Sequence, residues 1–309
     1  MKVVLSTLMV VGLLSGCAAK EARMPIGECA EVIGAQKILE DKNKPVLMFG
    51  HIHGTTESPK FVGDVLCHAV EMGNSVDLYL LINIDNQPFL DAFMASSGEE
   101  EDIKRLLLSN FWATDNSGHS SVGIFNLIDI ARQYKFDGAE INVWAYTDYN
   151  SSDADSEPYD SEREQRMSIE GADFVTRKMR LSSADKHIII SGDVDASKES
   201  LKFAGVNYDP VRKFLVEKPV YSFRMMANGG NAWVCWISRS EDTTIRTTEC
   251  GPRDWPDDTE YLKSDDYPYG FLGNSESTVD YYIEKYDGFY FVGPMSASNP
   301  ARTMIEKMP

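Results

Sequence analysis

Apolar runs of strand length alternate with longer amphipathic segments through most of the chain. The run 46–49 leads directly to His51, and a continuous apolar run of this kind is typical of a strand buried on both faces. Ser58 suits the cap of a following helix and Pro59 its first position, so we expect a helix from there to about Met72. We therefore predict a strand, then a turn that carries two histidines, then a helix.

The same alternation continues along the chain and changes after the fourth strand. Further strands are predicted at 75–84, 141–146 and 187–191, and helices at 28–39, 87–95, 99–110, 122–134 and 161–181. We interpret the later runs at 220–226, 231–238 and 244–250 as antiparallel strands, and we expect a last strand at 288–292. This order indicates an α/β fold with a mixed central sheet, flanking helices and antiparallel C-terminal strands.

The first residues resemble a bacterial lipoprotein signal. Lys2 precedes an apolar stretch that is too short to span a bilayer, and the stretch ends in Leu14-Ser15-Gly16-Cys17. On this interpretation residues 1–16 are removed, Cys17 carries the lipid, and residues 17–309 form a single domain on the membrane. Ala18 in place of Asp favours the outer membrane of the cell envelope. The alternative is an ordinary secretory signal with an incidental cysteine.

Charge and cysteine content restrict the partners and the compartment. The formal net charge of −18 argues against nucleic acid and against electrostatic docking on anionic lipid. Four cysteines follow Cys17, and an even number in an exported chain predicts two disulfides. A turn at 242–243 would place Cys235 opposite Cys250, and Cys29 with Cys67 follows by elimination. Free buried thiols are the alternative.

Polar residues gather where the predicted strands end. They are His51 and His53 after the first strand, Asn83 at the end of the second, Asp115 and His119 in a loop before a helix, and Asp193 and Asp195 after the fourth. In α/β folds ligands bind at such positions, and imidazole with carboxylate suits zinc or a similar divalent ion. His51, His53 and Asp195 are the predicted metal ligands, and these three with His119 are the candidate catalytic residues.

Each of these residues also has an ordinary structural interpretation. Asp193 and Asp195 could form a turn and cap a helix at 196–203. His119 could lie on a surface loop. The His-x-His pair alone is weak evidence for a site. Its place at a strand end and the second pair of polar residues two positions apart, Asp193 and Asp195, strengthen that evidence.

The turn after the first strand resembles a known motif. The pattern Gly50-x-x-His53-Gly54-Thr55-x-Glu57-x-Pro59 is similar to the Gly-Glu-x-His-Gly-Thr-x-Glu-x-Pro opening of a bacterial group in the superfamily that joins erythromycin esterases, ChaN-like haem-binding lipoproteins and Tiki/TraB-type proteins. The resemblance implies an α/β fold with its site at the strand ends. Some members of the superfamily hydrolyse esters or peptides, and some bind haem. The resemblance also adds Glu57 to the candidate ligand-binding residues Asn83, Asp115 and Asp193.

The chain departs from this group at its polar positions. His51 replaces a usual Glu, Asn83 replaces another, Ser117-Gly118-His119 replaces Asp-Gly-Arg, and Asp193-Val194-Asp195-Ala196 replaces Asn-x-His-Ala. These departures indicate a scaffold that has lost the ancestral chemistry. Because every replacement is polar, we also expect that acid and histidine have exchanged places. His51 and Asp195 would then keep a hydrogen-bonded pair or bind a metal together with His53.

Three functions follow as predictions. The first is a lipid-anchored envelope protein with a non-hydrolytic pocket for a small-molecule ligand, a divalent metal or haem. The second is a metal-assisted hydrolase that uses His51, His53 and Asp195 to hold a metal and its water. The third is an interaction module that binds another envelope protein.

Overall fold

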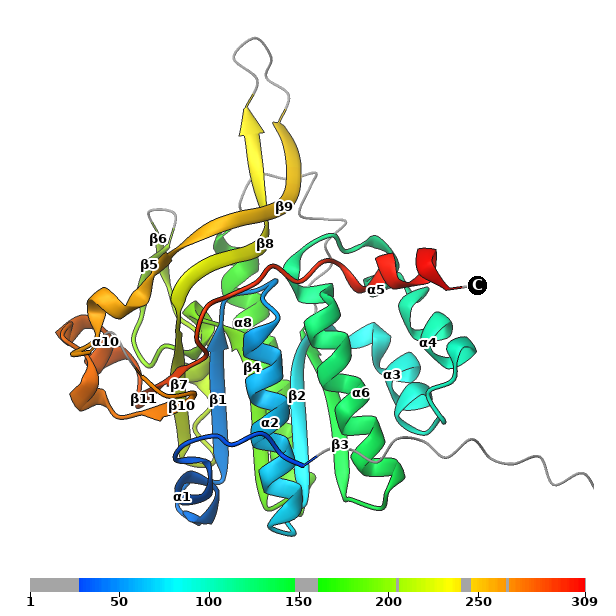
Figure 1. Cartoon of the computed structure of the whole chain (residues 1–309), viewed down its shortest axis with the longest axis horizontal. Coiled ribbons are helices and arrows are strands. Elements are labelled where there is room, and N and C mark those ends of the chain that lie inside the picture. The colour runs from blue at the N-terminus through cyan, green and yellow to red at the C-terminus, as the bar shows by residue number, and fades with distance from the viewer. Residues whose placement is uncertain (1–27, 148–160, 204–205, 240–245, 265–266, 309) are drawn as a thin grey trace, which may run out of the picture.

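A seven-stranded sheet forms the centre of the protein (Figure 1). The computed structural model describes residues 28–147, 161–203, 206–239, 246–264 and 267–308. The strand order is β10-β11-β7-β1-β4-β2-β3; β10 runs antiparallel to β11, and the other neighbouring pairs are parallel. The predicted α/β fold with a mixed central sheet is confirmed.

The elements of the fold have the following bounds. The sheet strands are β1 (Val46–His51), β2 (Val76–Asn83), β3 (Ile141–Thr147), β4 (Lys186–Gly192), β7 (Val220–Met226), β10 (Gly270–Leu272) and β11 (Gly288–Phe291). The α-helices are α1 (Ala35–Glu40), α2 (Glu57–Glu71), α3 (Gln87–Met94), α4 (Glu100–Leu107), α5 (Asn110–Thr114), α6 (Val122–Phe136), α8 (Ser161–Leu181), α9 (Val211–Phe214) and α10 (Asp280–Lys285). Two antiparallel ribbons lie outside the sheet, β5 (Leu201–Phe203) with β6 (Val206–Tyr208), and β8 (Asn228–Arg239) with β9 (Arg246–Asp257).

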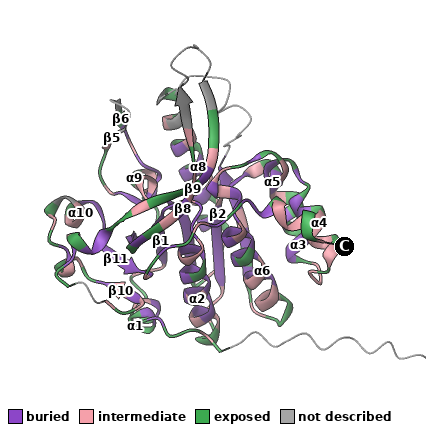
Figure 2. Cartoon of the chain, turned by 45° about the horizontal axis from the view of Figure 1, so that its top comes forward, coloured by how far each residue is buried: buried purple, intermediate pink, exposed green. Residues whose placement is uncertain are grey.

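Helices cover both faces of the sheet because its strands are apolar on both sides. All six residues of β1 are buried. Leu47 and Phe49 pack on the face that α2 and α6 cover, whereas Met48 packs with Ile189 on the face that α8 covers. Figure 2 shows the resulting buried layer between the helices. Successive side chains of a strand point to opposite faces, so this double burial explains the unbroken apolar run in the sequence.

Strand 220–226 runs in the other direction from the one predicted. β7 pairs parallel with β1 and with β11, so it belongs to the central sheet and not to an antiparallel unit. An apolar run reports burial and carries no information on strand direction, which is decided by the path of the preceding chain. The segment predicted as a helix at 196–203 also differs, because a 3₁₀ turn, Val194–Ala196, leads there into strand β5.

The start of α2 lies two residues before the predicted one, at Glu57 and not at Pro59. The helix begins at Glu57 after Thr56, whose side chain makes no capping hydrogen bond. The hydroxyl of Ser58 lies 2.7 Å from the hydroxyl of Tyr290 and links the first turn of the helix to β11. The Ser58 side chain therefore makes a tertiary contact in place of the helix cap that local propensity predicts.

Both disulfides are confirmed. Cys235 and Cys250 lie opposite each other in the β8–β9 ribbon, and Cys29 is bonded to Cys67 of α2. The signal segment 1–16 and the lipidation site Cys17 lie outside the described residues. Among the residues that are described, no helix is both long enough and apolar enough to span a membrane.

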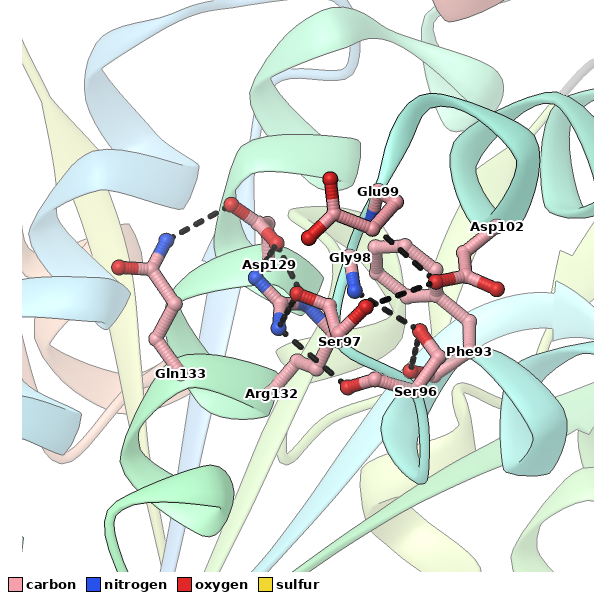
Figure 3. A network of polar contacts seen from close by, with 9 residues as sticks. All are labelled: Phe93, Ser96, Ser97, Gly98, Glu99, Asp102, Asp129, Arg132 and Gln133. Carbon is pink, nitrogen blue, oxygen red and sulfur yellow. Dashed lines mark hydrogen bonds and ion pairs between the residues drawn. The ribbon is translucent and has the colours of Figure 1, made fainter. Parts of the chain in front are cut away.

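Arg132 of α6 ties the connection between α3 and α4 to the core (Figure 3). Its Nε lies 2.7 Å from Oδ1 of Asp129, and its Nη1 donates to the main-chain oxygen of Ser97 at 2.9 Å. Gly98 has a φ of 73°, and a Cβ there would lie 2.3 Å from the Arg132 Cζ. The guanidinium therefore occupies space that only glycine leaves open.

Replacement of Arg132 by methionine should lower the free energy of unfolding by about 3 kcal/mol, because it leaves the half-buried carbonyl oxygen of Ser97 and the carboxylate of Asp129 without the guanidinium donor. Arg105 of α4 is exposed, so Arg105→Met is a matched control with an expected change within about 0.5 kcal/mol. Urea titration followed by circular dichroism measures both. Equal effects of the two variants would contradict a structural role for the Arg132 network.

Candidate functional site

His51 ends β1 at the carboxyl edge of the sheet, where it pairs with Gly192 of β4. Its side chain is 3% exposed, and its Nδ1 lies 2.7 Å from the main-chain oxygen of Ser191. A carbonyl oxygen only accepts hydrogen bonds. The neutral ring therefore carries its proton on Nδ1, and its Nε2 is an acceptor.

His53 continues this hydrogen-bonded chain. Its Nδ1 lies 3.1 Å from Nε2 of His51, with the two rings 80° apart. Because Nε2 of His51 is an acceptor, His53 must donate from Nδ1, and its own Nε2 then holds a lone pair. Two hydrogen bonds thus determine both tautomers and leave one unprotonated nitrogen, Nε2 of His53, for a ligand.

His119 stacks on the other face of His53. The ring centroids are 3.7 Å apart and the planes differ by 23°. Asp115 organises the loop before His119, because its Oδ1 accepts from the main-chain N–H of Ser117 and its Oδ2 accepts from the Ser117 hydroxyl. His119 is therefore part of the site, and the interpretation of this residue as a surface-loop histidine does not hold.

The three imidazoles favour the neutral form. Burial lowers the pKa of His51 to about 3, helped by His119 and opposed by the bond to Ser191. Burial also holds the pKa of His53 well below 6.5, and His119 and His51 act in the same direction. The pKa of His119 is lowered by burial against the opposing charge of Asp115. At neutral pH the cluster offers lone pairs and no positive charge.

Two glycines allow the backbone to bring these rings together. A Cβ at Gly118 would lie 2.2 Å from the main-chain nitrogen of Gly54, and a Cβ at Gly54 would lie 2.0 Å from the main-chain oxygen of Trp233. The Trp233 N–H donates to the oxygen of Gly54 at 2.8 Å, so the β8–β9 ribbon closes over the turn. The histidine turn is thus held between the 117–120 loop and the ribbon.

Asp195 and His53 both approach Gly192. A Cβ at Gly192 would lie 3.0 Å from Nε2 of His53 and 3.4 Å from Oδ2 of Asp195, so both acceptor atoms border the same small space. Oδ1 of Asp195 accepts from the hydroxyl of Tyr208 at 2.5 Å. That hydroxyl is also 2.5 Å from the Ser168 hydroxyl of α8. Asp195 is therefore held in place with one oxygen directed to the site.

The predicted hydrogen-bonded pair of His51 and Asp195 is not present in the structure. Both hydrogen bonds of His51 go to Ser191 and His53, and neither goes to Asp195. The acid of the site therefore faces His53. His51 acts behind His53 and offers no ring nitrogen to a metal in this arrangement, so the predicted set of His51, His53 and Asp195 is reduced to His53 and Asp195.

One further group of possible metal ligands was not predicted. Among the described residues, Cys29, His68 and Glu71 have ligand atoms within 4.8 Å of one another. Cys29 is bonded to Cys67, and a disulfide sulfur lacks the thiolate charge that metals require. This group is therefore a poor metal site.

The other predicted ligand residues have structural contacts. Oδ1 of Asn83 accepts from the main-chain N–H of Asp85 and caps a short 3₁₀ helix. Glu57 accepts from the main-chain N–H of Ser296 at 2.9 Å and from its hydroxyl, so it fastens the C-terminal segment to α2. Asn83 ends β2, as predicted, and Glu57 begins α2.

Asp193 belongs to a separate buried cluster. Its Oδ2 accepts from Nε of Arg224 at 3.1 Å, and Nη2 of Arg224 lies 3.6 Å from Oδ1 of Asp258. The guanidinium also lies over the Tyr282 ring at 4.2 Å. Sequence reasoning missed Arg224, although a charged residue inside the apolar run 220–226 is a visible signal of a buried ion pair. It also missed Tyr208, which no local pattern marks.

Comparison with protein-family models gives no match, and comparison with curated proteins gives none either. Solved structures do match. A variant of the erythromycin esterase EreC in its open conformation has a TM-score of 0.60 and 8% identity, covering 86% of this chain and 94% of that one. The chain has the erythromycin esterase fold. A succinoglycan biosynthesis protein has a TM-score of 0.59 and 11% identity, covering 85% of this chain and 91% of that one.

A haem-binding protein is also among the structural matches. ChaN of Campylobacter jejuni, described with cofacial haem, has a TM-score of 0.35 and 11% identity over 62% of this chain. A likeness at that level does not bear on haem binding by this chain. The resemblance found in the sequence is thus matched in the fold shared with the esterase.

Proposed function

We propose that this chain is a lipid-anchored cell-envelope protein that binds a cationic ligand between His53 and Asp195 and has no hydrolytic activity. The ligand is a divalent metal ion or a protonated amine. The observation that supports the proposal is the pair of acceptor atoms, Nε2 of His53 and Oδ2 of Asp195, beside the side-chain-free position Gly192.

The donor set suits a cation. A neutral imidazole nitrogen and a carboxylate oxygen are ligands for zinc and similar ions, and they also accept hydrogen bonds from an ammonium group. Metal-bound histidines usually donate their second ring N–H to a neighbouring acceptor, and His53 does so to His51 at 3.1 Å. His51 and Ser191 therefore support His53 from behind.

The same electrostatics disfavour hydrolysis by general base catalysis. An effective base has a pKa near the working pH, whereas the pKa of His53 is held well below 6.5. A base with so low a pKa has little driving force to remove a proton from water. This property leaves the lone pair free for binding at neutral pH.

Metal content and titration test the proposal. Protein purified without chelator should contain or take up about one Zn²⁺ per chain, or bind a simple amine in its place. His53→Gln, Asp195→Asn and Gly192→Ala should each weaken binding at least about tenfold in calorimetry, because they remove a ligand atom or fill its space. His68→Gln, which alters a histidine on α2 away from the site, should bind as the parent does. Equal binding by all four variants would contradict the site.

Hydrolysis is the second candidate, and the esterase fold favours it. The matched esterase covers 86% of this chain at a TM-score of 0.60. We expect no turnover of activated esters above the background rate. A rate that disappears in His53→Gln and in Asp195→Asn, but persists in His68→Gln, would overturn the non-hydrolytic proposal. A Soret band on addition of haem that is lost in the same two variants would change the ligand to haem.

The anchor is tested separately from the pocket. Labelled palmitate should be incorporated into the wild-type protein, and Cys17→Ala should abolish incorporation and release the protein from the membrane fraction. Retention of the variant together with another envelope protein would favour an interaction module.

A further inference from the structure

Large apolar side chains are exposed along the edge of the molecule opposite to the histidine site. Their exposed fractions are 39% for Met72, 49% for Phe136, 87% for Leu181 and 81% for Val216. Isolated exposed apolar residues are common, so their position is the informative feature.

These residues occupy equivalent places in the fold. Met72 follows α2 as its C-cap before β2, and Phe136 ends α6 before β3. Leu181 ends α8 before β4, and Val216 follows α9 before β7. The four strands that follow are parallel within the sheet, so their first residues share one edge. We call this edge the amino edge, and it is the lower one in Figure 1.

The described chain also begins at the amino edge. Cys29 is bonded to Cys67, and the main-chain oxygen of Ala30 lies 2.9 Å from Nε2 of His68. Both partners lie in the second half of α2, which ends beside Met72. Cys17 precedes the first described residue, 28, by 11 positions. An extended chain spans at most about 3.5 Å per residue, so a lipid on Cys17 lies within about 40 Å of this edge.

The charged residues next to Leu181 and Val216 form an ion pair with each other. Arg180 precedes Leu181, Glu217 follows Val216, and the guanidinium and carboxylate of these two residues form an ion pair. The apolar pair therefore carries no local excess of negative charge, in contrast to the chain as a whole at −18. Leu181 and Val216 can therefore enter the headgroup region without an unpaired charge from these two neighbours. Glu71 and Asp137, beside Met72 and Phe136, are exposed acids that favour a zwitterionic over an anionic lipid.

We propose that the amino edge rests on a phospholipid bilayer, with Leu181 and Val216 between the headgroups and the histidine site facing away from the membrane. The inference rests on the proposed lipid anchor on Cys17. It adds that the anchored protein has one orientation, in which the histidine site lies on the side away from the bilayer.

Fluorescence quenching of the lipidated full-length protein tests the orientation. An environment-sensitive dye is attached in turn to Leu181→Cys, Val216→Cys and, as controls, Leu108→Cys and Asn116→Cys. Leu108 is 64% exposed at the end of α4, and Asn116 is exposed near the histidine site. In phosphatidylethanolamine vesicles with a lipid-borne quencher, the dyes at 181 and 216 should be quenched at least about threefold more than both controls.

Flotation with the vesicles is measured first and separates the two proposals. Protein that fails to float overturns the anchor and the orientation together, whereas protein that floats with equal quenching at all four positions overturns the orientation alone. A blue shift at 181 and 216 in a detergent-stable dimer without lipid would assign the edge to a second copy and would also overturn the proposal. The variant Leu181→Glu with Val216→Glu should melt as the parent does and should reduce quenching of a dye at position 72 (Met72→Cys).

Discussion

Replacement of Gly118 by alanine should lower the free energy of unfolding by about 3 kcal/mol or more and separate His119 from His53. The new Cβ would lie 2.2 Å from the main-chain nitrogen of Gly54 and 2.5 Å from the main-chain carbon of His53. Backbone atoms cannot move aside as a flexible side chain can. The 117–120 loop must therefore shift as a whole.

The loss is measured by urea titration, and the displacement by the ring-proton NMR signals of the histidines, whose stacking shift should decrease. Gly273→Ala is the matched control, because its Cβ would meet a neighbouring atom only at 3.6 Å. That variant should change stability by less than about 0.5 kcal/mol. A Gly118→Ala protein with native stability and native histidine signals would show that the close approach is not required.

Replacement of Arg224 by methionine should have the second large effect, a loss of about 3–5 kcal/mol. Arg224 is 8% exposed and interacts with two carboxylates, those of Asp193 and Asp258. Methionine keeps much of the apolar volume but leaves both carboxylates without their cation. The same change at Arg253, which is exposed on the β8–β9 ribbon, should alter stability by less than about 1 kcal/mol.

The stability that Arg224→Met loses should depend on pH, and the titration of Asp258 determines the direction of this dependence. Burial raises the pKa of Asp258 from 3.8 to about 6, with Asp193 acting in the same direction and Arg224 against it. Between these two pH values the folded state binds more protons than the unfolded state. The contribution of Asp258 to the free energy of unfolding therefore decreases as the pH rises through this window.

Without Arg224 the pKa of Asp258 should rise further, which extends the window above pH 6. Arg224→Met should therefore lose more stability at pH 8 than at pH 5, as measured by urea titration at both pH values. The double variant with Asp258→Asn should reduce this difference, because the titrating group is gone. The same loss at both pH values would refute the assignment of the buried charge to Asp258.

The two buried clusters explain why the sequence departs from the group it resembles and still supports the same fold. His51 stands at the end of β1 and satisfies the oxygen of Ser191, so a polar side chain remains paired at that place. Asp195 is paired with Tyr208, which comes from a ribbon outside the central sheet. His51 and Asp195 therefore each have a hydrogen-bonding partner in the folded chain, which differs from what loss of function by random substitution would leave.

The sequence by itself determined most strands of the central sheet, the cysteine pairs and the side chains available at the strand ends. Apolar runs report burial on two faces, which is a local property, and a ribbon register of this kind places Cys235 opposite Cys250. The positions of His51 and His53 follow from the end of one such run. These features need few or no distant partners, so local patterns predict them.

The tertiary structure alone decided how these side chains are used. The tautomer of His51 depends on Ser191, which lies 140 residues later, and the place of His119 depends on the contact between Gly118 and Gly54. The parallel direction of β7 depends on the path of the preceding chain. Hydrogen-bond partners, close backbone contacts and strand direction arise from packing between distant segments, and the pattern of apolar and polar residues within one segment does not contain them.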